Sequence, residues 1–289
     1  MIVFGGAALS STGGGYGFGE IDDPFGLLEN AFDLGITTYD TAPIYGFGES
    51  ERVLGEAFLK NREKVKIISK AGVGWHDNGR VNMSNDPKLV LKMLEDSLRR
   101  LQSDYIDIYT IHWPDKKVDI RYPLEVLLKA QIQGKIHSIG LCNTNTLDLN
   151  LSSEMANIEF VQSEFNFFND GFSDLPSGDF QKMGWGTFDK GILAGTVKAD
   201  RKFSKHDCRS WAPWWKKSGW KEKVQYVEEF RDFTNIKSLA LHFSLQNMDM
   251  TLVGIKSIEQ LGEIIRLSHL NLDSEQILDA QKYFSKFRP

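Results

Sequence analysis

The sequence predicts an α/β protein, a (β/α)8 TIM barrel that forms a single domain over residues 1–289. Short runs rich in β-branched and aromatic residues alternate with longer amphipathic stretches, as expected for parallel strands joined by helices. The chain has 289 residues and 41% apolar side chains, which suits one large barrel core. A doubly wound sheet is the alternative, because the sequence alone does not show that the sheet closes.

The expected strands are too short to be helices and are separated by helical stretches. The strands are Ile2–Gly5, Thr37–Tyr39, Val65–Ser69, Tyr105–Ile111, Ile136–Leu141, Glu159–Ser163, Met183–Gly186 and Thr251–Val253. The clearest helices are Pro24–Leu34, Glu49–Lys60, Pro87–Leu101, Pro123–Gln133 and Ser257–Leu267.

The helix expected at Pro87–Leu101 has the most complete set of signals. Asp86 can cap its N-terminus, and proline suits the first helical position. Its apolar residues recur at helical spacing and define one buried face. They are Leu89, Val90, Met93, Leu94, Leu98 and Leu101.

The composition excludes several classes of function. The formal net charge is -5, so the clustered basic surface of a nucleic-acid-binding protein is not expected. Two cysteines provide no disulfide framework, and no stretch approaches the roughly 20 apolar residues of a membrane span. We therefore expect a cytoplasmic protein without nucleic-acid or membrane partners, whose oligomeric state the sequence does not indicate.

Four ionisable side chains lie where successive strands should end. Asp40 and Tyr45 follow the second expected strand, in YDTAPIYG. Lys70 ends the third strand in KIISK, and His112 ends the fourth in YIDIYTIHWPD. Catalytic groups of such barrels lie at the carboxyl ends of the strands, so we expect these side chains to face one another at one rim.

The four groups together are suited to proton transfer. A phenol, with a reference pKa of about 10, is a poor acid near neutrality. A nearby ammonium stabilises the phenolate, a carboxylate keeps that ammonium charged, and an imidazole can hold a carbonyl oxygen. This set suits protonating an oxygen as a carbonyl is reduced, or the reverse. Any one of these residues alone is more often structural, so the prediction depends on the combination.

The sequence resembles the aldo-keto reductase family. The resemblance rests on GITTYDTAPIYGFGESERVLGEAF, the KIISK lysine and the IHWPD histidine, followed by IGLCN, FVQSEFN, WGTFDKGILAG and TLVGIKSIEQLGEII. It implies an oxidoreductase that interconverts an aldehyde or ketone, a sugar included, with the alcohol by hydride transfer from NAD(P)H. In this reading Tyr45 is the general acid/base, Lys70 paired with Asp40 tunes it, and His112 orients the carbonyl.

The resemblance also implies residues that bind the cofactor. Asn143 and Gln162 match positions that bind the nicotinamide carboxamide, and Trp185 matches the aromatic residue that stacks on the ring. Cys142 stands where the family usually has serine, and a thiol is a weaker hydrogen-bonding group. The other implied contacts, to the pyrophosphate and the adenosine end, are Gly186, Phe188, Gly191, Gly195, Gly254, Lys256, Ser257, Gln260 and Glu263.

NADP is the expected cofactor, with NAD as the alternative. Lys256 can meet a 2′-phosphate as a point charge, and Ser257 can donate a hydrogen bond to it. Gln260, however, stands where NADP-preferring members often have arginine, and Ile264 replaces a common adenine-binding asparagine. No metal is expected, since the remaining histidines lack metal-site spacing. They are His76, His137, His206, His242 and His269.

Two further segments have an open role. Gly13–Glu20, in the loop after the first strand, fails the dinucleotide-binding spacing, but Tyr16 or Phe18 can reach a substrate at the rim. Val197–Lys223 is predicted to be long and irregular and contains four tryptophans, Trp211, Trp214, Trp215 and Trp220. These indoles either cover the pocket or fix the segment to the barrel.

Two other functions compete with the reductase. A cofactor-sensing regulatory subunit, like the potassium-channel β subunits, would retain the same four residues and make turnover secondary. A barrel glycosidase would use carboxylates such as Asp40 and Glu164, but would need no dinucleotide. Binding of a nicotinamide cofactor separates the glycosidase from the other two.

Overall fold

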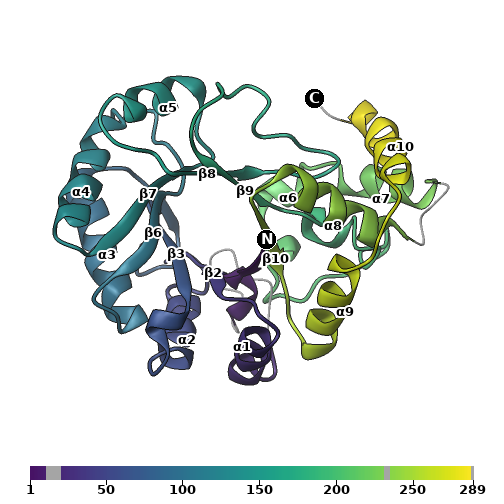
Figure 1. Ribbon diagram of the computed structural model, residues 1–289, viewed down its shortest axis with the longest axis horizontal. Coiled ribbons are helices and arrows are strands. Elements are labelled where there is room, and N and C mark those ends of the chain that lie inside the picture. The colour runs from purple at the N-terminus through teal and green to yellow at the C-terminus, as the bar shows by residue number, and fades with distance from the viewer. Residues whose placement is uncertain (11–20, 231–234, 288–289) are drawn as a thin grey trace.

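Eight parallel strands close into a barrel in the computed structural model, which describes residues 1–10, 21–230 and 235–287 (Figure 1). This closure confirms the predicted TIM barrel and rules out the doubly wound sheet. Gly13–Glu20, with Tyr16 and Phe18, lies outside the described residues. In order around the barrel the strands are β1 (Ile2–Gly5), β10 (Met250–Gly254), β9 (Gln181–Trp185), β8 (Phe160–Glu164), β7 (Ile136–Cys142), β6 (Ile106–Ile111), β3 (Lys66–Ala71) and β2 (Thr38–Asp40).

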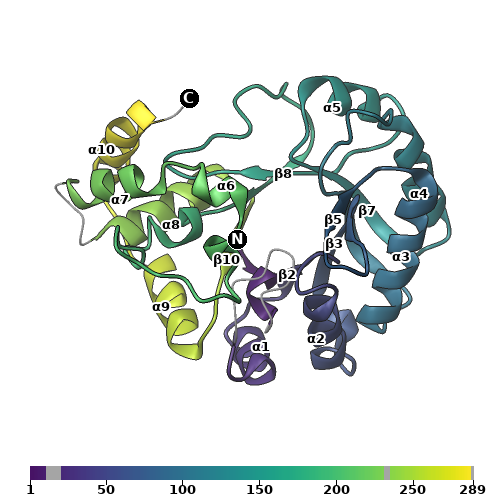
Figure 2. The same cartoon turned by 180° about the vertical axis from the view of Figure 1, so that it is seen from behind.

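Helices surround the strands on the outside (Figures 1 and 2). They are α1 (Pro24–Asp33), α2 (Glu49–Ala57), α3 (Pro87–Leu101), α4 (Arg121–Ile132), α5 (Thr146–Ser153), α6 (Pro213–Lys216), α7 (Trp220–Glu228), α8 (Ile236–Asn247), α9 (Ile258–Ser268) and α10 (Ser274–Phe284). Short 3-10 helices occur at η1 (Gly6–Leu9), η2 (Arg62–Lys64), η3 (Asp189–Gly191), η4 (Cys208–Ser210) and η6 (Ser285–Phe287). None of the helices within the described ranges is long and apolar enough to cross a bilayer.

The helix α3 forms over the predicted residues for the predicted reasons. Asp86 accepts hydrogen bonds from the backbone N–H groups of Lys88 and Leu89, and Pro87 occupies the first helical position. The apolar stripe is turned toward the barrel, where most of its residues are fully buried. Capping and patterning therefore act together to place this helix.

Alternation of side chains along the strands divides the core into two layers. Residues that point inward fill the barrel interior: Val3, Ile68, Ile108, Phe160, Met183, Met250 and Leu252. Residues that point outward pack beneath the helices in a larger cluster. Because the barrel interior is filled, a substrate has access only at the rims.

A small hairpin, which the sequence did not predict, follows β3. It consists of β4 (Val73–Trp75) and β5 (Val81–Met83), each only three residues long. Val73 packs with Ala42 and Ile44 of the segment after β2, and Tyr45 packs against this group. The hairpin therefore supports the segment that carries Tyr45.

The tryptophan-rich segment is more regular than predicted, because it contains η4, α6 and the start of α7. Trp215 is buried and stacks on Trp220, with ring centroids 5.4 Å apart. Phe203 packs edge-on against Trp215. Trp211 and Trp214 remain exposed. Two of the four indoles therefore fix the segment to the molecule.

Candidate active site

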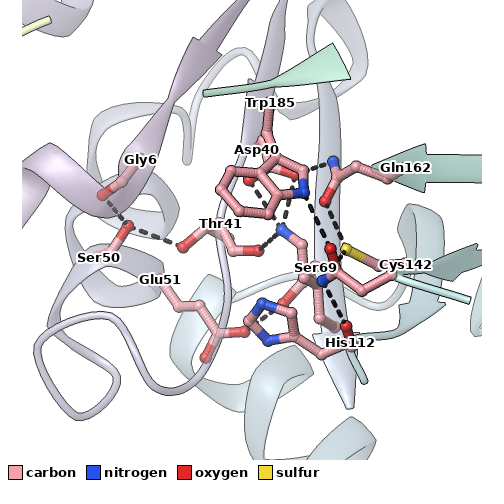
Figure 3. Close-up of polar contacts among 12 residues, drawn as sticks. Gly6, Asp40, Thr41, Ser50, Glu51, Ser69, His112, Cys142, Gln162 and Trp185 are labelled. Carbon is pink, nitrogen blue, oxygen red and sulfur yellow. Dashed lines mark hydrogen bonds and ion pairs between the residues drawn. The ribbon is translucent and has the colours of Figure 1, made fainter. Parts of the chain in front are cut away.

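Parallel pairing brings the ends of β2, β3 and β6, which carry Asp40, Lys70 and His112, to one rim of the barrel. Figure 3 shows Asp40 and His112 there. Asp40 is the last residue of β2, and Lys70 is the penultimate residue of β3. His112 directly follows β6, and its backbone N–H donates to the carbonyl of Ala71, 2.8 Å away. His112 thus continues the pairing of β6 with β3, and this fixes where its side chain emerges.

Lys70 and Asp40 form a buried ion pair. The Lys70 Nζ lies 2.8 Å from Asp40 Oδ1 and 2.7 Å from Asp40 Oδ2, and it donates a third hydrogen bond to the Thr41 carbonyl at 2.8 Å. An ammonium has three donors, so all of them are used. Removing two charges from water costs several kcal/mol per ion, and complete pairing offsets this cost. The ammonium is consequently held at one place.

The carboxamide of Gln162 extends this network to β8. Its Nε2 donates to Asp40 Oδ2 at 2.8 Å, and its Oε1 accepts from the Cys142 thiol at 3.1 Å. Burial raises the pKa of Cys142 to about 12, so the thiol remains protonated and acts as a donor. Cys142, which stands where the family usually has serine, therefore orients Gln162.

Asn143 connects the network to the ends of β6 and β9. Its Nδ2 donates to the His112 carbonyl at 3.0 Å and to the Cys142 sulfur at 3.1 Å. Its Oδ1 accepts from the Trp185 indole N–H at 3.1 Å. Asn143 has a φ of 52°, a left-handed conformation that asparagine tolerates better than most residues. This turn directs its carboxamide across the rim.

His112 provides a neutral ring beside the charged pair. Burial, followed by the positive charge of Lys70, lowers the pKa of His112 well below the usual value of 6.5. Its buried Nδ1 has no hydrogen-bond partner among the described residues. The ring therefore has one uncharged nitrogen that donates and one that accepts.

Tyr45 lies near both His112 and Lys70. The rings of Tyr45 and His112 meet edge-on, with centroids 6.1 Å apart, and the Lys70 Nζ lies 5.5 Å from the centre of the tyrosine ring. The phenol ring is half-buried, whereas the lysine and the histidine are buried. A molecule at the rim can thus reach Tyr45 more easily than the groups behind it.

The loop after β9 contains charged residues that the sequence reasoning missed. Asp189 and Lys190 both adopt left-handed backbone conformations, with φ of 39° and 55°. Buried Asp189 pairs with Lys190 at 3.1 Å and with Lys223 of α7 at 2.8 Å, and Lys190 also pairs with Glu164. Burial alone would raise the pKa of Asp189, but the two lysines outweigh it and hold that pKa below its usual value.

This loop also carries the residues matched to the pyrophosphate site. Gly186, Gly191 and Gly195 have φ values of 77°, 103° and 68°, which side chains disfavour. Phe188 precedes η3 and packs against the core. The Lys190 Nζ lies 5.3 Å from the centre of the Trp185 ring. The loop is tightly turned: the backbone N–H groups of Gly191 and Gly195 donate to the carbonyls of Phe188 and Ile192, and charge pairs hold its shape.

The residues matched to the adenosine end cluster between β10 and α9. The Ser257 hydroxyl caps α9 by accepting from the Gln260 N–H at 3.2 Å, and Gln260 Oε1 accepts from the Lys256 N–H at 3.0 Å. Glu263 pairs with Lys237 of α8. At Gly254 a Cβ would meet nothing within 4 Å, so the end of β10 borders open space.

Lys256 lies in a basic neighbourhood. Burial lowers its pKa; Asp207 opposes this shift, and the charges of Arg209 and Arg201 add to it. The described residues contain no group of three or more His, Cys, Asp or Glu side chains that could hold a metal ion. Around Lys256, two arginines, Arg209 and Arg201, therefore face one carboxylate, Asp207, which is paired with Arg209.

The side chains present fit a nicotinamide cofactor. Gln162 uses one of its two N–H donors and one lone pair of its oxygen, so it can both donate to and accept from a carboxamide. Asn143 Oδ1 keeps a second lone pair. Trp185 is half-buried at the same rim and offers a flat face for stacking.

Comparison with known proteins gives a consistent picture. A model of the aldo/keto reductase family matches residues 1–283. "Aldo-keto reductase YhdN" of Bacillus subtilis is 30% identical over 283 residues, covering 92% of this chain and 85% of the relative. The "NADH-specific methylglyoxal reductase" of Escherichia coli is 27% identical over 271 residues, covering 85% and 82%. The structure of a glycerol dehydrogenase from Gluconobacter oxydans aligns with a TM-score of 0.83 and 26% identity, covering 100% and 93%.

The neutral state of His112 leads to a testable expectation. In histidine-labelled protein, the ring nitrogens of His112 should keep the shifts of a neutral ring as the pH falls through 6.5. The unfolded chain takes up a proton at this residue near that pH and the folded chain does not. The free energy of unfolding should therefore fall with acidification below about pH 6.5, and less steeply in His112→Gln. Protonation of the folded His112 ring near pH 6.5 would contradict this.

Proposed function

The chain belongs to the aldo/keto reductase family, and from this premise we propose that it interconverts an aldehyde or ketone with the corresponding alcohol, a sugar included, using Tyr45 as general acid/base. One observation carries the proposal. The Lys70 ammonium is held by Asp40 and Thr41 at 5.5 Å from the Tyr45 ring centre, while His112, whose ring meets Tyr45 edge-on, is kept neutral.

Tyr45 would donate its phenolic proton to the carbonyl oxygen during reduction and take it back during oxidation. The ammonium of Lys70 favours the phenolate, so it makes the loss of that proton easier. Asp40 keeps the ammonium in place but touches no substrate itself. His112, being neutral, can orient the carbonyl oxygen with a hydrogen bond without competing for the proton.

A nicotinamide cofactor, when bound, supplies the two-electron chemistry. Asn143 and Gln162 would hold its carboxamide, with Cys142 orienting Gln162, and Trp185 would pack against the ring. Backbone groups of the loop after β9 would approach the pyrophosphate at Gly186, Phe188, Gly191 and Gly195. The adenosine end would lie against Gly254, Lys256, Ser257, Gln260 and Glu263.

NADP is the proposed cofactor, because Lys256, with Arg201 nearby, provides the positive charge that a 2′-phosphate requires, whereas Arg209 is paired with Asp207. NAD is the alternative, since the relative from Escherichia coli is named as NADH-specific and Gln260 provides no charge. The side-chain contacts of Ser257 and Gln260 within the α9 N-terminus leave Lys256 as the main candidate for phosphate recognition.

Replacement of Tyr45 tests the proton donor. Tyr45→Phe should lower kcat by about 10²- to 10⁴-fold, because it deletes the acid and preserves the ring. Cofactor affinity, followed by quenching of tryptophan fluorescence, should stay within about twofold. Tyr122→Phe, at an exposed residue of α4, is the matched control.

The outcomes of that experiment separate the candidate functions. Full activity in Tyr45→Phe would remove the assigned role. Cofactor binding without turnover by the unaltered chain, over a panel of sugars and simple carbonyls, would favour a cofactor-sensing regulatory subunit. Absence of cofactor binding would contradict both readings.

Replacement of Lys256 tests the cofactor preference. Lys256→Met should weaken NADPH binding by about ten- to a hundredfold, because one charge-assisted contact is lost. NADH binding should change little, because NADH has no 2′-phosphate. Lys92→Met, at an exposed lysine of α3, controls for the loss of a surface charge. Equal weakening of both cofactors would show that Lys256 does not discriminate between them.

A further inference from the structure

The first turn of α2 contains two polar side chains that are fully buried. Ser50 and Glu51 each have 0% relative exposure, although Glu49 beside them is half-buried. The helix start is not stabilised by a side-chain cap, since its N-cap is Gly48. Buried polar groups persist where their hydrogen bonds are made. The partners of these two residues therefore indicate what the turn does.

Ser50 lies in a directional chain of hydrogen bonds (Figure 3). Its hydroxyl donates to the Gly6 carbonyl at 2.8 Å and lies 2.7 Å from the Thr41 hydroxyl. A carbonyl only accepts, so the single proton of Ser50 is used there, and Thr41 must donate to Ser50. The carbonyl of the same Thr41 accepts from the Lys70 ammonium. Ser50 thus holds Thr41, and the carbonyl of Thr41 in turn holds the Lys70 ammonium.

The backbone of Ser50 also holds the loop that carries Tyr45. Its N–H donates to the Tyr45 carbonyl at 3.3 Å. The next three loop residues are left-handed, with φ of 61° at Gly46, 53° at Phe47 and 86° at Gly48. For Phe47 such a conformation is strained, because the left-handed region brings the Cβ close to a backbone carbonyl. The loop therefore needs contacts from outside to keep its shape.

Glu51 attaches the same turn to the strand behind the ammonium. Its Oε1 accepts from the Ser69 hydroxyl at 2.6 Å, and its Oε2 accepts from Arg100 Nε at 2.6 Å. Ser69 precedes Lys70 on β3, and alternation turns its side chain to the helix side of the strand. A Cβ at Gly48 would lie 2.6 Å from the Arg100 Cδ, so Arg100 packs closely on the tyrosine loop.

We propose that Ser50 is a positioning residue that keeps Tyr45 in register with Lys70. Its backbone N–H bonds to the carbonyl of Tyr45, and its hydroxyl bonds to the hydroxyl of Thr41, whose carbonyl accepts from Lys70. Glu51 prevents the helix turn from moving relative to β3. The inference rests on the proposed function, since it assumes that the Tyr45–Lys70 pair transfers the proton. It assigns Ser50 no contact with substrate or cofactor.

The variant Ser50→Ala removes the hydroxyl and leaves Thr41 and Gly6 without their partner. We expect kcat to fall about ten- to a hundredfold, since misplacement of a reacting group by about 1 Å has effects of this size. KM and cofactor affinity should stay within about twofold. In the reduction direction, the fall of kcat at high pH should move upward by about half a pH unit or more, because a displaced ammonium favours the phenolate less.

Ser244→Ala is the matched control. Ser244 of α8 is also a fully buried helical serine, and its hydroxyl donates to the hydroxyl of Thr251 on β10 at 3.2 Å. It should lower Tm comparably without changing kcat or the pH profile. Thr41→Val provides a second variant, because it removes the hydroxyl that donates to Ser50 and keeps the side-chain shape. It should give the same upward pH shift.

A normal kcat and pH profile in Ser50→Ala, with Tm lowered as in the control, would overturn the proposal. So would a parallel loss of cofactor affinity and kcat, which would indicate general damage to the site. If Ser50→Ala does not fold, a normal pH profile in Thr41→Val would overturn it as well. Failure of the proposed function is seen separately, as full activity in Tyr45→Phe.

Discussion

The buried ion pair between Lys70 and Asp40 is the interaction on which the rim of the barrel depends. The three donors of the ammonium meet three acceptors, two on Asp40 and one on Thr41. Such a pair is costly to bury and strongly destabilising to break, so it resists displacement. Asp40 also accepts from Gln162, and through Cys142 and Asn143 the same network reaches Trp185. The strand ends that would bind the cofactor and those that would transfer the proton are therefore aligned by one set of contacts.

The charged side chains at this rim are balanced within small groups. The ammonium is balanced by Asp40, and the imidazole of His112 is kept neutral by burial and by the lysine charge. A second charge group, formed by Glu164, Asp189, Lys190 and Lys223, balances itself beneath the loop after β9. Both carboxylates considered for a glycosidase, Asp40 and Glu164, are thus occupied by lysines. Asp40 and Glu164 are therefore not available as the free carboxylate pair that a glycosidase needs.

The sequence was sufficient for the order of strands and helices and for the position of the four residues at the strand ends, because both follow from local patterns, whereas closure of the sheet is seen only in the structure. Strand runs, the capped helix α3 and the position of each ionisable residue after its strand are all readable over a few residues. The β4–β5 hairpin was missed since strands of three residues give no periodic signal. The partners of Ser50, Glu51 and Asp189 could not be read from the sequence either. These contacts join residues as much as 49 positions apart, which meet only when the barrel closes.

A double-mutant cycle between Asp40 and Lys70 tests the central claim most directly. Single-turnover rates would be measured for Asp40→Asn, Lys70→Met and the double variant, each saturated with cofactor. If Asp40 acts only by holding the ammonium beside Tyr45, the double variant should be no slower than Lys70→Met alone. If the two losses instead multiply, Asp40 contributes to the reaction independently of Lys70, and holding the ammonium is not its only role.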